Sequence, residues 1–451
     1  MTATTGEPTE PQKPQSFFKV FAGLGAMSFL TYMGEYAAFI IVLVYLSDKF
    51  VVNFGLGDAG YAFVGTISGA FLIASGLVAI YMGHLSDKYG RRKMMIIGCL
   101  VGAAALLSLI VANGFSQLAP FAIATAISLT TLGIAHGTYT ASTLAYGGDL
   151  AEKHQTMGKA YGLVDGAEFA GYAFGPALGT TVAFLTNSRT AVFEMSTVML
   201  LISAGLAVVF MPEIRPATSV AAAPMIMGMS HDHDEDEGSH HDAHSHSASW
   251  GDYVNAFRTP IVGVALLTTL VGAIGFSAFF SFVPLYAQRL EGLVPQFRYL
   301  FGYFASIMAI TGVLFMVPLG HYEDRTERRM PYLVAGLIGA SASLSIVFFF
   351  PPSLASFLIA AVAYGLSIGA VRVSQLVILA EASHPSNRAA IMGTNHALEH
   401  VGYGLAAFLI GTLIALPRGL GGFENAFRIL SLILIVAGVA FLFYARWAKV
   451  K

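Results

Sequence analysis

The chain has few charged residues, one cysteine and two tryptophans. Charged residues make up only 11% of its 451 residues, whereas soluble domains carry about 25%, so a soluble protein is excluded. The single Cys99 excludes an internal disulfide. The sequence has no phosphate-binding loop, nucleophile constellation or cofactor motif. We therefore expect no enzyme, no resident cofactor and no nucleic-acid partner.

Long apolar runs are abundant instead, and hydrophobic residues form 56% of the chain. A helix that spans a bilayer needs about 20 predominantly apolar residues. Lipid offers the backbone no hydrogen bonds, so such segments are helical. The sequence therefore predicts an all-α membrane protein with twelve transmembrane helices. The twelve candidates are 19–46, 59–82, 94–112, 118–146, 160–186, 190–211, 259–287, 299–319, 331–350, 353–380, 390–416 and 426–445.

The distribution of Lys and Arg predicts the orientation. With a cytoplasmic N-terminus, the inside segments carry 17 of these residues and the outside segments six, leaving Arg372 within a helix. Both termini are therefore predicted in the cytoplasm. The first 16 residues lack the pattern of a cleaved signal peptide. We expect an uncleaved multi-pass protein of a bacterial inner membrane or an organelle membrane.

Internal repeats divide the chain into two pseudo-symmetric halves of six helices. Glu168-x-x-Gly171-Tyr172 is repeated as Glu399-x-x-Gly402-Tyr403, at an offset of 231 residues. Parallel repeats of this kind occur in transporters whose substrate site lies between the halves. The predicted parts are a disordered cytoplasmic N-terminus (1–16), a first bundle (17–212), a His- and Asp-rich linker (213–257), a second bundle (258–447) and a cytoplasmic tail (448–451).

A second repeat is found at 83–92 and, in degenerate form, at 320–329. In each half it joins two apolar runs. The glycines permit tight turns and close helix approach, and Asp87 can cap the start of the third helix or pair with a basic residue. The first copy resembles the signature loop of the major facilitator superfamily, G-x-x-x-D-[RK]-x-G-[RK]-[RK]. This resemblance implies two six-helix halves that alternate access to a central site, with the loop as a cytoplasmic latch. The matching residues are Gly83, Asp87, Lys88, Gly90, Arg91 and Arg92, with Asp324, Arg328 and Arg329 in the second copy.

The fifth predicted helix resembles the antiporter motif of the same family, G-x-x-x-G-P-x-x-G, through Gly171, Gly175, Pro176 and Gly179. The glycines form a smooth stripe for close packing, and the proline bends the helix. Within the family this motif is typical of exporters that exchange a solute for protons. Simple small-residue packing is the alternative. Drug exporters of the family usually carry a buried Arg in the fourth helix, where this chain has His136.

Ionisable residues within predicted membrane helices are costly and indicate a substrate or proton pathway. His396 and His400 are four residues apart, a spacing that lets one helix offer two imidazoles to a metal. The group suits proton coupling or a cation site, whereas isolated structural pairs are the alternative. The predicted pathway residues are Glu35, His136, Asp165, Glu168, Arg372 and Glu399, with His396 and His400 as metal ligands.

The linker between the halves is rich in histidine and acid. Its high charge predicts disorder, and its histidines predict weak, adaptable metal binding. A solvated linker without a specific ligand is the alternative. The candidate ligands are His231, His233, His240, His241, His244 and His246.

These features together predict a proton-coupled secondary active transporter that moves a transition-metal cation (iron, zinc, nickel or copper) by alternating access, as an exporter or an importer. An exporter of drugs or other organic solutes, with an incidental linker, is the alternative. A metal-responsive membrane receptor is a third interpretation. The expected partners are the small solute or metal cation, protons and the lipid bilayer, and we expect a monomer.

Overall fold

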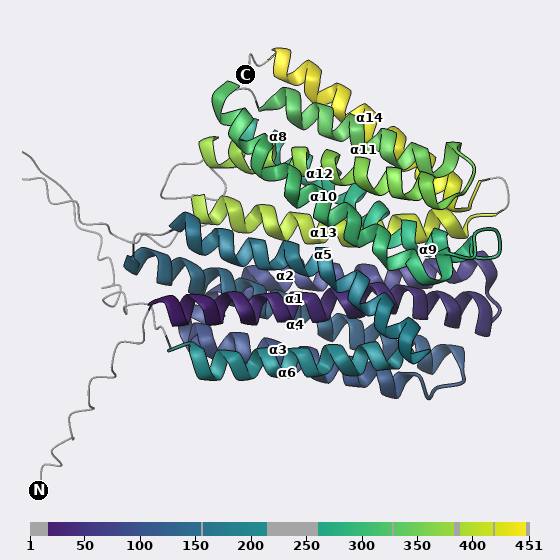
Figure 1. Ribbon diagram of the computed structural model, residues 1–451, viewed down its shortest axis with the longest axis horizontal. Helices are drawn as coiled ribbons and strands as arrows, with labels where there is room; N and C mark the ends of the chain where they lie inside the picture. Colours follow the sequence, from purple (N-terminus) through teal and green to yellow (C-terminus); the bar gives the residue numbers. More distant parts are fainter. Residues whose placement is uncertain are drawn as a thin grey trace, which may run out of the picture.

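The computed structural model describes most of the chain as a bundle of long helices (Figure 1). The predicted N-terminal region 1–16, nearly all of the linker and the end of the tail lie outside the described residues. The described ranges are 17–154, 157–213, 260–326, 329–382, 388–417 and 420–447.

The first half contains six long helices that follow one another up and down the bundle. After α1 the chain continues as a short π-helical segment, η1, and a 3-10 turn, η2. The elements are α1 (Phe17–Ser47), η1 (Asp48–Asn53), η2 (Gly57–Ala59), α2 (Gly60–Tyr89), α3 (Arg91–Ala112), α4 (Leu118–His154), α5 (Met157–Thr186) and α6 (Thr190–Phe210).

The second half repeats this order, with its first rod built from α8, η3 and α9. Its elements are α8 (Pro260–Ser277), η3 (Ala278–Phe282), α9 (Val283–Arg289), α10 (Phe297–Thr326), α11 (Met330–Phe349), α12 (Leu354–Ala382), α13 (Arg388–Ala415) and α14 (Phe423–Trp447). Counted this way, the described residues form twelve rods, which confirms the predicted all-α fold. The start of α1 and the end of α14 lie at the same end of the bundle (Figure 1).

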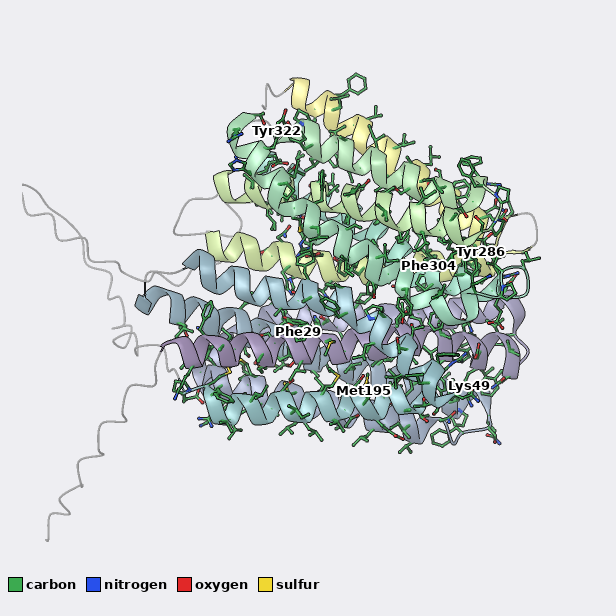
Figure 2. All side chains as sticks on the ribbon, in the orientation of Figure 1. Phe29, Lys49, Met195, Tyr286, Phe304 and Tyr322 are labelled. Atoms are coloured by element: carbon green, nitrogen blue, oxygen red, sulfur yellow. The ribbon has the colours of Figure 1, made fainter. Side chains whose placement is uncertain are left out.

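The outer surface of the bundle is apolar, as a bilayer requires. Large side chains such as Val111, Leu185 and Phe443 are 65% or more exposed, and Figure 2 shows side chains of this kind along the outer helices. Among the described residues, eleven helices contain a stretch long and apolar enough to cross a membrane. The remaining rod is α5, which holds Glu168, Pro176 and several glycines.

The predicted loop at 83–92 is largely helical, which corrects the sequence interpretation. α2 continues through Tyr89, and α3 begins at Arg91, so Gly90 alone joins the two helices. Asp87 therefore lies in the last turn of α2. The ends of α4, α10 and α12 likewise extend beyond the predicted apolar runs, because polar residues continue a helix once it leaves the lipid.

Gly90 permits this sharp junction because it has a φ of 106°, a backbone conformation that other residues rarely adopt. A methyl group at this position would also collide with the carboxylate of Glu213. We expect Gly90→Ala to destabilise the protein by about 1–2 kcal/mol, measured as a lower thermal midpoint in detergent. Gly205→Ala is the matched control, because Gly205 lies within α6 with open space around its Cα. Equal midpoints for both variants would contradict this role of Gly90.

The two halves meet along two repeat-related helix pairs, α2 with α13 and α5 with α10. Glycines allow the backbones to approach closely in both places. A methyl group added at Gly69 would lie 2.7 Å from the carbonyl oxygen of Gly404, and one added at Gly302 would lie 2.7 Å from that of Pro176. These small residues give two seams where the halves pack closely.

Candidate functional site

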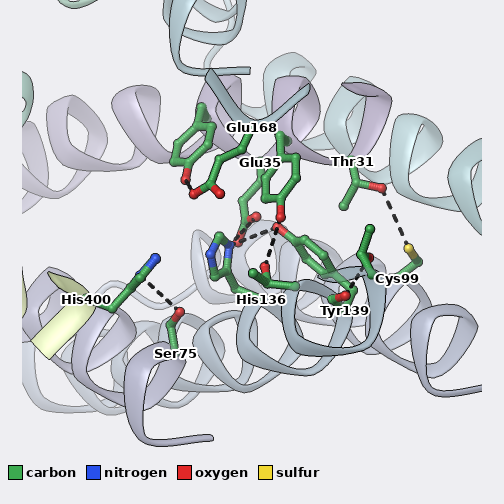
Figure 3. A network of polar contacts seen from close by, with 12 residues as sticks. Thr31, Glu35, Ser75, Cys99, His136, Tyr139, Glu168 and His400 are labelled. Atoms are coloured by element: carbon green, nitrogen blue, oxygen red, sulfur yellow. Dashed lines mark hydrogen bonds and ion pairs between the residues drawn. The ribbon is translucent and has the colours of Figure 1, made fainter. Parts of the chain in front are cut away.

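A cluster of buried polar side chains lies between the two halves (Figure 3). Its core in the first half is a contact between Glu35 on α1 and His136 on α4, both almost completely buried. Nδ1 of His136 lies 2.7 Å from Oε2 of Glu35 and 2.8 Å from the hydroxyl of Tyr139. An ionised carboxylate only accepts hydrogen bonds, so an ionised Glu35 favours the tautomer of His136 that carries its proton on Nδ1. Nε2 of His136 has no hydrogen-bond partner among the described residues.

The second half contributes His400 to this cluster. The rings of His136 and His400 are 4.9 Å apart between centroids, which joins α4 to α13 across the interface. Ser75 on α2 lies 3.2 Å from Nδ1 of His400. The imidazole of His400 is therefore positioned by Ser75 and faces His136, and both of these residues belong to the first half.

Glu168 on α5 completes a group of three possible metal ligands. One ligand atom each from His136, Glu168 and His400 lies within 4.8 Å of the others, and all three residues are buried. The hydroxyl of Tyr36 donates to Oε1 of Glu168 at 3.5 Å, and the ring of Tyr36 stacks on Tyr172 at 3.8 Å. The first half thus supplies two of the three groups and the second half supplies one.

The described contacts distinguish His400 from its predicted partner His396. Their rings are 4.6 Å apart between centroids. The three-residue group nevertheless pairs His400 with His136 on another helix rather than with His396. Spacing along α13 shows that two imidazoles share a face, but it cannot show which ring meets the opposite half. The role predicted for His396 stays a prediction.

An ion pair lies nearby in the second half. Arg372 on α12 donates to Glu399 on α13, and the hydroxyl of Tyr403 donates to the same carboxylate. The guanidinium of Arg372 also lies over the ring of Phe169 on α5, 4.7 Å from the ring centre. The partly buried charge of Arg372 is thereby matched by a carboxylate and an aromatic face.

Three uncharged polar residues beside this ion pair were not found from the sequence. Thr269 donates to Oδ1 of Asn395, and Nε2 of Gln375 donates to the same oxygen at 2.8 Å and to the Thr269 hydroxyl. Hydroxyl and amide side chains are common in membrane helices, so the sequence does not identify these three residues as functional. Thr269 and Gln375 become candidates because they line a cavity.

The residues of the loop signature make contacts within the first half. Nε of Arg91 lies 3.0 Å from Oδ2 of Asp149, and Arg92 donates to the backbone oxygen of Val208 at 2.8 Å. In the second copy, Arg329 faces the buried Glu323. The side chains of Asp87, Asp165 and Asp324, the surroundings of Gly83, and all of Arg328 and the six linker histidines lie outside what the structure describes.

The antiporter-like motif in α5 packs on two partners. Gly171, Gly175 and Gly179 all face α1, where added methyl groups would collide with its backbone or side chains. After Pro176, the backbone N–H of Ala177 donates to Ser306 on α10 at 2.9 Å. A proline disturbs the helical hydrogen bonds around it. The glycines of the motif therefore pack α5 against its own half, and the hydrogen bond from Ala177 to Ser306 joins α5 to the other half.

The fold and the buried interface cluster define a membrane transporter with two six-helix halves. The chain belongs to the Major Facilitator Superfamily, whose family model matches residues 24–313 and 297–450. It is therefore a multi-pass membrane protein that transports a small solute. None of the curated proteins matches this chain.

Solved structures show the same fold. The nucleoside transporter NupG has a TM-score of 0.70 and 14% identity, covering 94% of this chain and 98% of that one. The POT family transporter PepTSo has a TM-score of 0.69 and 11% identity, covering 97% and 99%. The human organic anion transporter MFSD10 (TETRAN) has a TM-score of 0.62 and 15% identity, covering 95% and 100%. At these identities the similarity concerns the fold alone.

Proposed function

We propose that this protein carries a divalent transition-metal cation across the membrane in exchange for protons. The observation that supports this most is the meeting of His136, Glu168 and His400, whose ligand atoms lie within 4.8 Å of one another. Two imidazoles and a carboxylate suit zinc, iron(II), nickel or copper(II) better than the harder magnesium or calcium. Three protein ligands leave at least one position for water, as sites that exchange their ligands do.

Glu35 orients the first of these ligands. A histidine that binds a metal usually donates its other ring N–H to a carboxylate, which fixes the ring and makes it a better ligand. The contact between Glu35 and Nδ1 of His136 has this form, and it leaves Nε2 for the metal. Glu35 is thus a positioning residue and His136 a ligand.

Alternating access follows from where the ligands come from. His136 and Glu168 belong to the first half and His400 to the second, so separating the halves on either side opens the site. At the end of the bundle opposite the start of α1, Gln288 donates to Asp48 at 2.8 Å and Arg289 pairs with Asp58, which holds the halves together there. These contacts support a site that faces the end where α1 begins. The excess of Lys and Arg supports a cytoplasmic location for that end.

Proton exchange follows from the ligand chemistry. A metal binds carboxylate and neutral imidazole, so protons and metal compete for Glu168 and the two histidines. The halves then return with protons in place of the metal. In this proposal the linker histidines collect metal on the cytoplasmic side and the α2–α3 junction at 83–92 acts as the latch. The protein works as a monomer in a bacterial inner membrane or an organelle membrane.

A second candidate function is the export of an organic solute. The observation in its favour is the aromatic lining of the neighbouring cavity, where Phe169, Tyr172, Phe276 and Tyr403 lie beside Arg372. Flat aromatic faces bind organic rings and organic cations well.

Counterflow in proteoliposomes separates the two candidates. Vesicles preloaded with unlabelled zinc should take up radioactive zinc transiently, and a panel of organic cations in the preload should not drive this exchange. Zinc that binds without crossing would favour a receptor. Organic cations that exchange while zinc does not would transfer the proposal to the second candidate.

A further inference from the structure

Aromatic rings lie beside the three-residue group on the side toward the outer end of the bundle, which is the end opposite the start of α1. α5 runs toward this outer end, because Arg189, shortly after it, pairs with Asp48 there. Tyr172 therefore lies one helical turn closer to the outer end than Glu168. The ring of Tyr36 on α1 stacks on Tyr172, with 3.8 Å between the ring centroids. These two rings are the contribution of the first half to an aromatic layer.

The second half completes this layer with two phenylalanines. Phe276 on α8 and Phe280 on η3 stack on each other, with 5.2 Å between their ring centroids. Both rings meet Tyr172 edge-on, at 5.4 and 5.3 Å. Phe280 also lies 6.1 Å from the ring of Tyr36. The four rings, which we call the aromatic seal, therefore connect the two halves.

The aromatic seal lies between the cavity at the interface and the outer end. Tyr172 and Phe276 line the cavity. The rod that contains α8 and α9 runs toward the outer end, because Arg289 at its end pairs with Asp58 there. Phe280 is therefore about one turn closer to the outer end than Phe276. All four rings of the seal are at most 9% exposed, so they close this route in the present conformation.

The helical turn that carries Phe280 is unusual. η3 is π-helical and interrupts the rod between α8 and α9, and π-helical turns are rare and often occur at functional sites. Phe279, the preceding residue, faces its own half, where its ring stacks on Tyr364 at 4.5 Å. Ser277, just before η3, donates to the backbone oxygen of Tyr403 on α13 at 3.0 Å. η3 is thus held by the second half, while Phe280 contacts the first half.

We propose that the aromatic seal is the gate on the outer side of the interface and that Phe280 is the residue that opens it. When the halves separate at the outer end, Phe280 stays with the second half and leaves Tyr36 and Tyr172. A phenylalanine side chain forms no hydrogen bonds, so these ring contacts part and form again without leaving a polar group unpaired. The gate controls access to the interface and does not depend on which solute the protein carries.

The test measures access to a cysteine placed in the cavity. Cys99 is the only cysteine of the chain, so Cys99→Ser gives a background without cysteine. In this background, Met316→Cys places a cysteine in the cavity wall on α10. Asn53→Cys places one at an exposed position of η1 and identifies the vesicles whose outer side faces the reagent. A membrane-impermeant maleimide is added to sealed membrane vesicles of each orientation, and the rate of labelling is measured.

With the seal intact, the cavity cysteine should react more slowly from the outer side than from the other side. Phe280→Ala should raise the outer rate by about ten- to a hundredfold, as expected for the loss of two aromatic pairs across the interface. Phe280→Leu keeps an apolar side chain without a ring and should give a smaller increase. Phe279→Ala is the matched control, because it removes an equally buried ring from the same turn that faces the second half. It should leave the outer rate unchanged.

Size-exclusion chromatography establishes that each variant is folded, and Phe280→Leu alone decides the outcome if Phe280→Ala does not fold. Three results would each overturn the proposal: an unchanged outer rate in the folded Phe280 variants, an equal increase in Phe279→Ala, or equal rates from both sides with the seal intact. No measurement in this test uses zinc, so a failure of the gate would leave the metal proposal untouched.

Discussion

We expect His400→Ala to abolish zinc accumulation in vesicles and His396→Ala to retain it. The two residues lie four positions apart on α13, but only His400 belongs to the three-residue group with His136 and Glu168. Removing one of three protein ligands should lower metal affinity by at least about a hundredfold, more than the tenfold to hundredfold loss typical of outer-shell residues. His136→Ala should have the same effect as His400→Ala.

The measurement is initial zinc uptake over a range of zinc concentrations, with the amount of inserted protein determined for each variant. His396→Ala is the control for loss of an imidazole from the same helix. Equal loss in both single variants would instead support the i, i+4 pair predicted from the sequence. Unchanged uptake in His400→Ala would contradict the site at the interface.

Glu168→Gln should eliminate zinc accumulation driven by a pH gradient. The substitution removes the anionic ligand and a group that exchanges a proton for the metal, while an amide of nearly the same size keeps the packing around Tyr36. We expect at least about a tenfold loss of zinc affinity, since the charge-assisted contact is lost. Wild-type uptake should weaken as the pH on the binding side falls, because protons then compete with the metal for the ligands.

Two comparisons make this result specific. Glu194→Gln changes an exposed acid on α6 and should leave accumulation unchanged. Glu399→Gln removes the repeat-related acid and should leave zinc uptake largely intact, since Glu399 is paired with Arg372 rather than with the metal ligands. Accumulation against a gradient by both Glu168→Gln and Glu399→Gln would place the coupling proton elsewhere, with His136 and Asp165 as the next candidates.

Much of the fold could be predicted from the sequence because the membrane imposes a simple rule on each segment. A run of about 20 apolar residues has to be helical in lipid, and the repeat at Glu168 and Glu399 related the halves. The ends of the helices were predicted less well. Polar residues such as Asp87 can continue a helix beyond the lipid, and hydropathy does not distinguish this from a loop.

The site could be predicted only in part. Burial of charge inside apolar helices identified Glu35, His136, Glu168 and His400 as functional candidates. Their partners depend on how α4, α5 and α13 meet, which no local pattern records. The contact of Ser75 with His400 and the arrangement of Thr269 with Gln375 depend on packing between helices distant in sequence, so the sequence carried no signal for them.

X-ray absorption at the zinc edge tests the central claim most directly. The sample is full-length protein with one equivalent of zinc, compared with a variant lacking residues 230–247, which removes the linker histidines. In the protein that lacks residues 230–247, we predict a zinc ion bound by two imidazole nitrogens and by carboxylate or water oxygens at about 2.0–2.2 Å. When His400→Ala is added to this deletion, the zinc ion should lose one of the two imidazoles. A variant without the linker segment that binds no zinc, or whose zinc spectrum is unchanged by His400→Ala, would contradict a metal site shared by the two halves.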